Sequence, residues 1–320
     1  METKQVRDIM IKLRENIQQV IVGKHEEIDI IIVALIAGGH ALLEDVPGTG
    51  KTVLAKTLAK SLDGTFQRIQ FTPDLLPGDV TGVTIYNQKE ATFQFRQGPV
   101  FTQVLLADEI NRATPRTQSA LLEAMEEKQV TTDGETRALP RPFFVIATQN
   151  PVEIQGTFPL PEAQLDRFFI RTKMGYPDKL DAISILSRFI DKQPLDTLQS
   201  VATAQDILGA QQSFQQVQVN DAVKGYIVDL AAHTRQMDMV SLGVSPRGSL
   251  ALMRAAQIWA LLQDRSFVTP DDVKAVALPV LGHRMITKST LGARGNAAEM
   301  VVQELLSSVP VPTEAFVDKQ

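Results

Sequence analysis

The stretch EDVPGTGKT, residues Glu44–Thr52, lies between a short apolar run and a segment with helical spacing. The apolar run is Ala41–Leu43, and the helical segment is Thr52–Ser61. A glycine-rich turn from a strand into a helix directs several backbone N–H groups at one point, and binding a phosphate requires this arrangement. Gly48 and Gly50 let the backbone come close to that phosphate. The stretch therefore predicts a phosphate-binding loop.

Individual residues of this loop have distinct expected roles. Lys51 would reach the β- and γ-phosphates of a nucleotide, and the Thr52 hydroxyl would bind Mg²⁺. The pattern normally begins with glycine, but this chain has Asp45 there. A carboxylate would repel phosphate unless it pointed away, so we expect Asp45 to face outward as a turn former. The residues that we assign to nucleotide binding are Pro47, Gly48, Thr49, Gly50, Lys51, Thr52 and Val53.

Two adjacent acids end a second apolar run. The run is Val104–Ala107, and Asp108 and Glu109 follow it. Buried strands rarely end in neighbouring carboxylates without a cation to balance them. With a phosphate loop upstream, Asp108 is placed to hold Mg²⁺ through its water shell, and Glu109 to polarise an attacking water. For this pair alone a solvated strand end is the alternative, but the two motifs together are more specific than either.

Strand-like and helical segments alternate through the first half of the chain. Besides the two runs above, the segments Phe66–Phe71, Phe143–Ala147 and Phe168–Ile170 have the character of buried strands. Helical stretches such as Pro115–Glu127 lie between them. Strands that are apolar on both faces and alternate with helices predict a parallel sheet covered by helices. We therefore predict an α/β fold with a five-stranded parallel sheet.

Two β-hairpins are expected to interrupt this alternation. The first spans Thr81–Gln97, where two alternating segments flank a polar turn. The second spans Val130–Arg137 and has Asp133–Gly134 at its tip, a strong hairpin signal. Hairpins inserted into such a core usually make contacts with other molecules.

The second half of the chain has a different pattern. After Asp178 the strand pattern ends and helical spacing dominates, with helix starts marked at Ser245–Pro246 and Thr269–Pro270. We place a domain boundary there. The expected domains are a nucleotide-binding core over residues 1–177 and a helical domain over residues 178–320.

Composition excludes several classes of protein. The 320 residues carry a formal net charge of −5, so the chain as a whole is not a polycation that binds nucleic acid. It has no cysteine and only four histidines, none at metal-ligand spacing, which argues against disulfides, thiol catalysis and a zinc site. The most apolar run, Ile30–Ala37, is far shorter than the about 20 residues of a membrane span. We expect a cytoplasmic protein.

Several stretches together resemble the MoxR family of AAA+ ATPases, and the resemblance covers essentially the whole chain. They are Glu44–Thr52, Ala107–Ala113, Ala147–Pro151 and Pro161–Phe168, followed by Ser245–Arg247 and Gly282–Arg284. The resemblance implies an AAA+ P-loop NTPase core followed by an all-α lid domain. It also implies hydrolysis of ATP with Mg²⁺ as cofactor.

The resemblance assigns roles to residues outside the two motifs. Asn150 would help to orient the lytic water, although an asparagine that caps a turn is the alternative. Arg167 resembles an arginine finger that reaches the γ-phosphate of a neighbouring subunit; the alternative is a surface salt bridge. Arg247 would contact phosphate from the lid of the same chain. Val22 and Gly23 match a segment that flanks the adenine, or simply end a helix.

The resemblance to this family implies a ring-shaped homohexamer that remodels or activates a protein client. The implied partners are a protein with a von Willebrand factor type A domain and an enzyme complex that needs maturation or metal insertion. One alternative is a nucleic-acid translocase, which the mixed charges of the two hairpins argue against. A magnesium-chelatase-like subunit is another alternative, and a switch that binds ATP without turnover is a third. The combination of Glu109, Asn150 and Arg167 argues against such a switch.

Overall fold

The computed structural model describes residues 1–151, 156–188, 190, 193–288 and 297–312. The chain divides into two compact units, which are described separately below. One unit is Asp8–Ala210, and the other combines Met1–Arg7 with Gln211–Gln320. Helices α1 (Thr3–Gln18) and α9 (Ala204–Ser213) contain the residues at which the chain passes between the units.

The division of the chain lies later than the boundary that we expected near Asp178. The segment after α8 (Pro194–Thr197) is tied to the end of α3 (Lys51–Ser61) by backbone bonds, because Val201 and Ala202 both donate their N–H groups to the carbonyl of Ser61. Lys60 also donates to carbonyls of α8. These hydrogen bonds hold the segment to the first unit although its sequence has no strand pattern.

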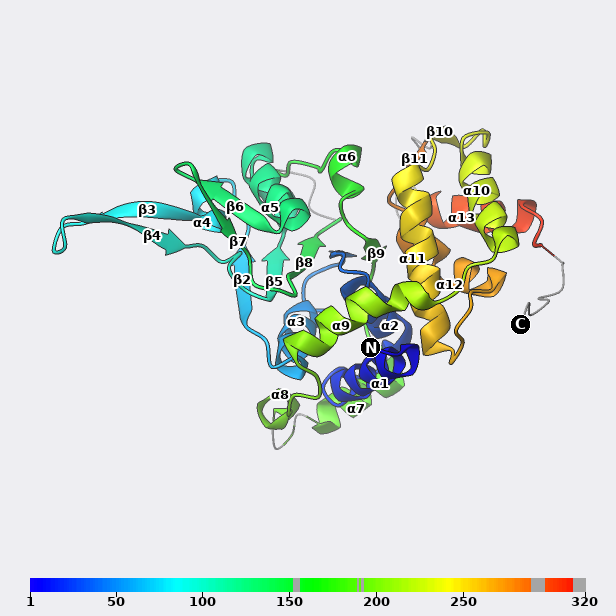
Figure 1. Cartoon of the computed structure of the whole chain (residues 1–320), viewed down its shortest axis with the longest axis horizontal. Coiled ribbons are helices and arrows are strands. Elements are labelled where there is room, and N and C mark those ends of the chain that lie inside the picture. Colours follow the sequence, from blue (N-terminus) through cyan, green and yellow to red (C-terminus); the bar gives the residue numbers. More distant parts are fainter. Residues whose placement is uncertain (152–155, 189, 191–192, 289–296, 313–320) are drawn as a thin grey trace. The chain divides into compact units, whose positions relative to one another are not determined.

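A five-stranded parallel sheet forms the centre of the first unit (Figure 1). Its strand order is β2-β5-β8-β1-β9, so the strand before the phosphate loop lies inside the sheet. The three inner strands are buried on both faces along most of their length, as the continuous apolar runs predicted. The predicted α/β fold is confirmed. The strands are β1 (Ala41–Glu44), β2 (Phe66–Gln70), β5 (Val104–Asp108), β8 (Phe144–Gln149) and β9 (Ile170–Thr172).

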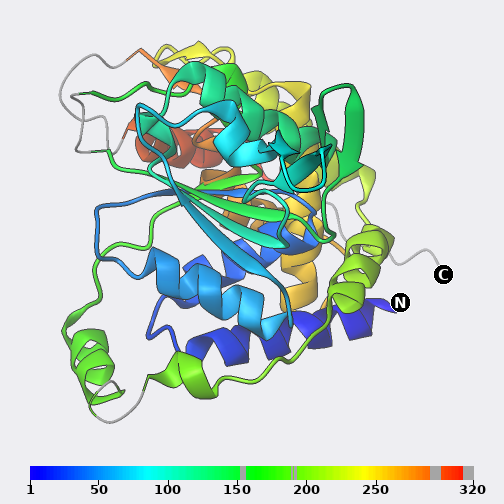
Figure 2. The ribbon, with the colours of Figure 1, turned by 90° about the vertical axis from the view of Figure 1, so that its left-hand side faces the viewer.

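Helices cover both faces of this sheet. Figure 2 shows α3 on one side of the strands and α5 (Pro115–Glu127) on the other. Both helices begin where the sequence predicted them within one residue, and α5 has Pro115 at its first position. Besides α8 and most of α1 and α9, the first unit contains the helices α2 (His25–Ile36), α4 (Pro77–Thr81), the short η1 (Ile110–Arg112), α6 (Glu162–Leu165) and α7 (Lys179–Arg188).

Both predicted hairpins are present. Strands β3 (Gly82–Asn87) and β4 (Thr92–Gln97) form the first, and β6 (Gln129–Thr132) and β7 (Glu135–Ala138) form the second. Asp133 and Gly134 both have positive φ angles, 54° and 80°, as a tight two-residue hairpin turn requires. The guanidinium of Arg137 lies 4.0 Å from the centre of the Phe95 ring, which joins the two hairpins by a cation–π contact.

The second unit is mainly helical. Its helices are η2 (Phe214–Gln216), α10 (Asp221–Thr234), α11 (Pro246–Leu262), α12 (Pro270–Leu281) and α13 (Ala297–Ser308). The predicted caps are present: the Ser245 hydroxyl accepts from the N–H of Gly248, and Thr269 and Asp272 form a capping box at α12. The unit also contains a ribbon that the sequence did not predict, β10 (Val240–Leu242) paired with β11 (Ile286–Thr287). Strands of two and three residues are too short to show a period.

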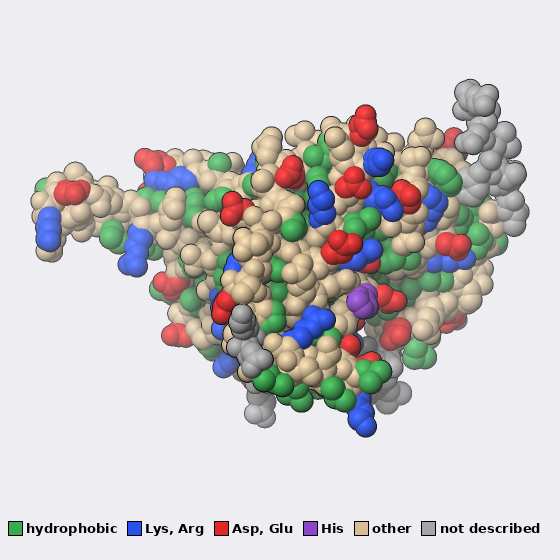
Figure 3. Space-filling view, turned by 90° about the horizontal axis from the view of Figure 1, so that it is seen from below, with side chains coloured by type: hydrophobic (Ala, Val, Ile, Leu, Met, Phe, Trp, Pro, Cys, Tyr) green, Lys and Arg blue, Asp and Glu red, His purple; other side chains and the backbone are tan. Residues whose placement is uncertain are grey.

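Charged side chains of both signs are interspersed on the face seen in Figure 3. At the tip of the first hairpin, Lys89 is followed directly by Glu90.

In the ranges that the structure describes, none of the helices has the length and apolar character needed to cross a membrane.

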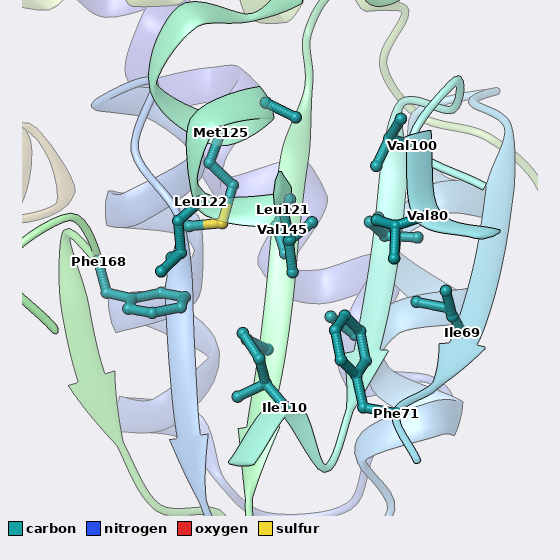
Figure 4. Packing of buried hydrophobic residues seen from close by; sticks show 14 of the residues in the cluster. Ile69, Phe71, Val80, Val100, Ile110, Leu121, Leu122, Met125, Val145 and Phe168 are labelled. Atoms are coloured by element: carbon teal, nitrogen blue, oxygen red, sulfur yellow. The ribbon is translucent and has the colours of Figure 1, made fainter. Parts of the chain in front are cut away.

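One hydrophobic core cluster of the first unit lies between the sheet and α5 (Figure 4). Strand β5 contributes Leu105 and Ala107, β8 contributes Val145, and α5 contributes Leu121 and Met125, all of them almost completely buried. Alternate residues of each strand point to this side because side chains in a strand alternate between faces. The packing fixes β5 and β8 against each other, and therefore fixes the polar residues at their carboxyl ends.

Candidate functional site

The predicted phosphate loop is an open turn between β1 and α3. Gly48 and Gly50 have φ angles of +87° and +89°, in the region that favours glycine. A Cβ atom built on either glycine would meet no atom within 4 Å, so backbone conformation and not crowding requires glycine. Gly50 is the residue that precedes α3, and it has no side chain to accept the first N–H groups of that helix. Those N–H groups form a fitting cradle for an anion.

Lys51 rests within this loop. Its ammonium group donates to the carbonyl oxygen of Val46 at 2.7 Å and lies 3.4 Å from that of Asp45. The ammonium group is thus held beside the cradle by neutral acceptors. A phosphate can replace those acceptors with a charged one, which makes a stronger hydrogen bond.

The position of Asp45 differs from our expectation. We predicted an outward-facing turn former, but its side chain is buried and only 6% exposed. The carboxylate accepts from the backbone N–H groups of Met174 and Gly175, which follow β9. These two donors explain why an acid is tolerated here, because they satisfy its charge.

The two acids at the end of β5 are held by a hydroxyl from the neighbouring strand. Thr148 Oγ1 donates to Asp108 Oδ1 at 2.6 Å and accepts from the N–H of Glu109 at 2.8 Å. Glu109 has a left-handed backbone with φ of 56°, which is uncommon outside glycine and occurs preferentially at functional sites. This turn directs the two consecutive carboxylates to one edge of the sheet.

Strand β2 adds two side chains beside these acids. Arg68 Nη2 lies 2.6 Å from Asp108 Oδ2. Gln70 pairs in register with Asp108, and its Nε2 donates to Glu109 Oε2 at 2.7 Å. Arg112 also donates to Glu109 Oε2, at 2.9 Å. Each acid therefore has a cationic or amide partner.

These residues surround one cavity of about 400 Å³, within the usual size range of small-molecule sites. The lining residues are Asp45, Pro47, Gly48, Gly50, Lys51, Thr52, Val53, Arg68, Gln70, Asp108, Glu109, Thr148 and Asn150. Thr52 and Asp108, the two expected Mg²⁺ ligands, both belong to this set. Across the described ranges the chain has no group of three or more acids and histidines that could form a complete metal site. The oxygen donors of Thr52 and Asp108 fit Mg²⁺, which usually takes one or two protein ligands together with phosphates and water.

Comparison with known proteins agrees with this geometry. Residues 40–170 match the family model described as "ATPase family associated with various cellular activities (AAA)", and residues 232–305 match the AAA lid domain. The chaperone MoxR1 of Mycobacterium tuberculosis is 40% identical over 313 residues, which are 95% of this chain and 82% of that protein. The chain belongs to the MoxR-type AAA+ ATPases. The resemblance that the sequence suggested is thereby confirmed.

Two further relatives match this MoxR-type ATPase along nearly its whole length. The uncharacterized protein YeaC of Bacillus subtilis is 52% identical over 303 residues, 95% of both chains. A solved structure of a candidate ATPase from Cytophaga hutchinsonii superposes with a TM-score of 0.89 at 37% identity and covers 97% of both chains.

Some predicted site residues of this AAA+ ATPase lie outside the cavity. Val22 and Gly23 lie between α1 and α2, and Gly23 has a φ of +65°, in the region that favours glycine. Arg167 follows α6 and pairs with Glu126 at 3.1 Å, so the salt bridge that we weighed as its alternative does exist. Arg247 is an exposed residue in the first turn of α11, in the helical unit.

Sequence reasoning missed three residues of the cavity, Arg68, Gln70 and Thr148. Arg68 and Gln70 are two apart in a strand and therefore share a face. A pair of polar residues with this spacing in a strand next to the acidic strand is a usable signal. However, it becomes visible only when β2 is known to neighbour β5.

Proposed function

We propose that this MoxR-type chain binds ATP with Mg²⁺ and hydrolyses it to drive the remodelling of a protein client. One observation supports the chemistry most: the glycine loop, both acids of β5 and the polar residues that end β8 line a single cavity. Backbone N–H groups of the loop and Lys51 would hold the phosphates. Mg²⁺, held by Thr52 and Asp108, would neutralise charge on the phosphates.

Glu109 is the proposed base. Hydrolysis adds a water oxygen to the γ-phosphorus and breaks the bond to the bridging oxygen, which leaves ADP and inorganic phosphate. Glu109 is placed at the cavity to accept the proton of that water, and Asn150, 8% exposed at the end of β8, to orient the water. Gln70 and Arg112 both donate to Oε2 of Glu109 and thereby hold the carboxylate at the cavity.

Two arginines complete the proposed machinery from outside the cavity. Arg167 would reach the γ-phosphate of a neighbouring subunit, where a cation stabilises the charge that develops during transfer. Arg247 would contact phosphate from the helical unit of the same chain and would couple that unit to the state of the nucleotide. Val22 and Gly23 would flank the adenine.

The proposed assembly is a homohexameric ring with chaperone activity. The relative MoxR1 is a chaperone by name, which supports a protein client. The proposed partners are a protein with a von Willebrand factor type A domain and an enzyme complex that it matures, by metal or cofactor insertion. The β3–β4 hairpin suits client contact because it exposes Tyr86 and Phe93, which face each other across the strands with ring centres 5.2 Å apart. A cytoplasmic location stays a prediction.

Nucleotide binding is tested with Lys51→Ala. Wild-type protein should show a nucleotide-dependent rise in melting temperature, because a ligand that binds only the folded state stabilises it. The variant should lose this rise and keep the melting temperature of nucleotide-free wild type. Lys56→Ala in the same helix is the matched control and should behave as wild type. Wild-type protein that shows no stabilisation by nucleotide and Mg²⁺ would contradict the proposal.

The role of Arg167 across an interface is tested by mixing inactive subunits. Arg167→Ala subunits keep their base and Glu109→Gln subunits keep their finger, so a mixed assembly should regain part of the ATPase activity. Glu126→Gln is the control, because it breaks the ion pair of Arg167 but leaves the arginine in place. No recovery in assemblies shown to contain both subunits would rule out a finger in trans.

A further inference from the structure

Asp108 has a hydrogen-bond partner on each of its two carboxylate oxygens. Thr148 donates to Oδ1 at 2.6 Å, and Arg68 lies 2.6 Å from Oδ2. A metal ion on Asp108 would share the carboxylate with these partners, and its charge would repel a partner that is itself a cation. The structure allows us to say which one leaves.

Thr148 is held firmly. It is 1% exposed, it lies in an inner strand, and its oxygen also accepts the N–H of Glu109. Arg68 lies in β2, at the edge of the sheet, and 47% of its side chain is exposed. Its other bond is a neutral one, from Nη2 to Gln70 Oε1 at 3.0 Å. Moving Thr148 would disturb the backbone of the base, whereas moving Arg68 requires only side-chain rotation.

We propose that Arg68 is a positioning residue that neutralises Asp108 before the metal arrives and yields Oδ2 to Mg²⁺ when the metal–nucleotide complex binds. This inference rests on the proposed nucleotide site. Arg68 itself lines the cavity, so the displaced guanidinium stays close to the space that the phosphates would fill.

The exchange has a thermodynamic consequence. Without Mg²⁺, the phosphates of a nucleotide meet an Asp108 whose charge Arg68 already balances. With Mg²⁺, the displacement of Arg68 from Asp108 reduces the net free energy of metal binding. Removing the positive charge of Arg68 reverses both effects. Metal-free nucleotide is then repelled by the unbalanced charge of Asp108, and Mg²⁺ binds Asp108 without a competing cation. The ratio of nucleotide affinity with Mg²⁺ to affinity in chelator should therefore be larger without Arg68.

The experiment measures equilibrium binding of a fluorescent, slowly hydrolysed ATP analogue, with Mg²⁺ and with EDTA. In Arg68→Gln this affinity ratio should rise about fivefold over wild type, the size expected for loss of one partly exposed charge pair. Arg68→Lys keeps the charge and should stay near the wild-type ratio. Arg96→Gln, the same change on the exposed strand β4, is the control and should leave the ratio unchanged.

A double-mutant cycle shows whether the effect runs through Asp108. In an Asp108→Asn background, Arg68→Gln should no longer change the affinity ratio. If Arg68→Gln lowers affinity equally in both conditions, Arg68 is a simple phosphate contact and the exchange is wrong. An undiminished rise in the Asp108→Asn background would equally exclude it. Wild-type protein that binds no analogue in either condition overturns the nucleotide site itself, and this inference with it.

Discussion

The two ends of the parallel sheet both carry polar side chains, but their partners differ. At the amino end, directly before β1, the buried His40 ring accepts from the N–H of Val145 at 3.0 Å and lies 3.1 Å from the carbonyl oxygen of Met125. At the carboxyl end, Asp108 and Glu109 bond mainly to other side chains around a cavity. The partners of His40 are backbone groups of β8 and α5 and cannot leave without disturbing those elements, whereas the side-chain partners of the two acids can be replaced by a ligand.

The two acids and His40 therefore differ in the groups that they bond to, and we expect this difference to decide whether each residue supports the chemistry or the fold. This difference predicts that changes at the carboxyl end alter chemistry with little effect on stability. Changes at the amino end should alter stability with little effect on chemistry.

The largest effect is expected for Glu109→Gln at the carboxyl end. Removing the base should lower ATP turnover about 100-fold or more while nucleotide still binds. The free energy of unfolding should change by less than about 0.5 kcal/mol, because the side chain faces the cavity and not the core. Steady-state ATPase assays and denaturant unfolding measure the two quantities.

The control for that variant is Glu123→Gln, an exposed acid on α5 outside the cavity, which should leave both quantities unchanged. Normal turnover in Glu109→Gln would remove Glu109 as the base. A loss of several kcal/mol in the free energy of unfolding would instead show that Glu109 stabilises the fold. The expected difference between the two ends of the sheet would then be wrong.

The division between fold and site also describes what the sequence could reveal. The sheet and both hairpins were predicted because apolar runs and the Asp133–Gly134 turn are local signals. The ribbon of β10 and β11 was not, since such short strands are fixed by tertiary contacts. The unit boundary also depends on long-range hydrogen bonds, here those from Val201 and Ala202 to Ser61, which no local pattern contains.

The next effect in size is a pH dependence at the amino end. Burial lowers the pKa of His40 from 6.5 to about 4, and Lys128 adds a smaller lowering. Between these values the unfolded chain takes up a proton that the folded one does not. The contribution of His40 to stability is thus complete above pH 6.5 and is lost as pH falls to about 4, by about 3 kcal/mol in total.

Denaturant unfolding at several pH values measures this loss. Asparagine does not titrate in this pH range. The free energy of unfolding of His40→Asn should be lower than that of wild type at pH 7, and its decrease between pH 7 and pH 4 should be about 3 kcal/mol smaller. His25→Asn removes an exposed histidine and should keep the wild-type slope. A His40→Asn slope equal to that of wild type would show that other groups cause the acid sensitivity.

At the site, the motif residues could be predicted because the loop and the acids are each contiguous in sequence. Arg68, Gln70 and Thr148 could not be, because they reach Asp108 and Glu109 from neighbouring strands. Asp45 shows a different limit. Its residue type and position were plain, but its donors, the N–H groups of Met174 and Gly175, come from a segment 129 and 130 residues later.

Asp45 gives the finest test of the comparison, because it lies at the carboxyl end yet bonds to backbone N–H groups. By its partners it belongs with His40, although it lines the cavity. Asp45→Asn removes the charge and replaces one acceptor oxygen by a donor, so both N–H groups lose a charged acceptor. We expect a loss of about 1–2 kcal/mol in the free energy of unfolding and a nucleotide affinity within about twofold of wild type.

Asp238→Asn, the same change at an exposed position, should alter neither quantity and serves as the control. If Asp45 instead faced the phosphates, removing its charge would raise nucleotide affinity several-fold and leave stability unchanged. Calorimetric titration with nucleotide and Mg²⁺, together with denaturant unfolding, distinguishes the two results. A loss of stability with nearly unchanged nucleotide affinity would mean that, even within the phosphate loop, the bonding partner of an acid decides whether it supports the fold or the chemistry. The location of the acid would then not decide it.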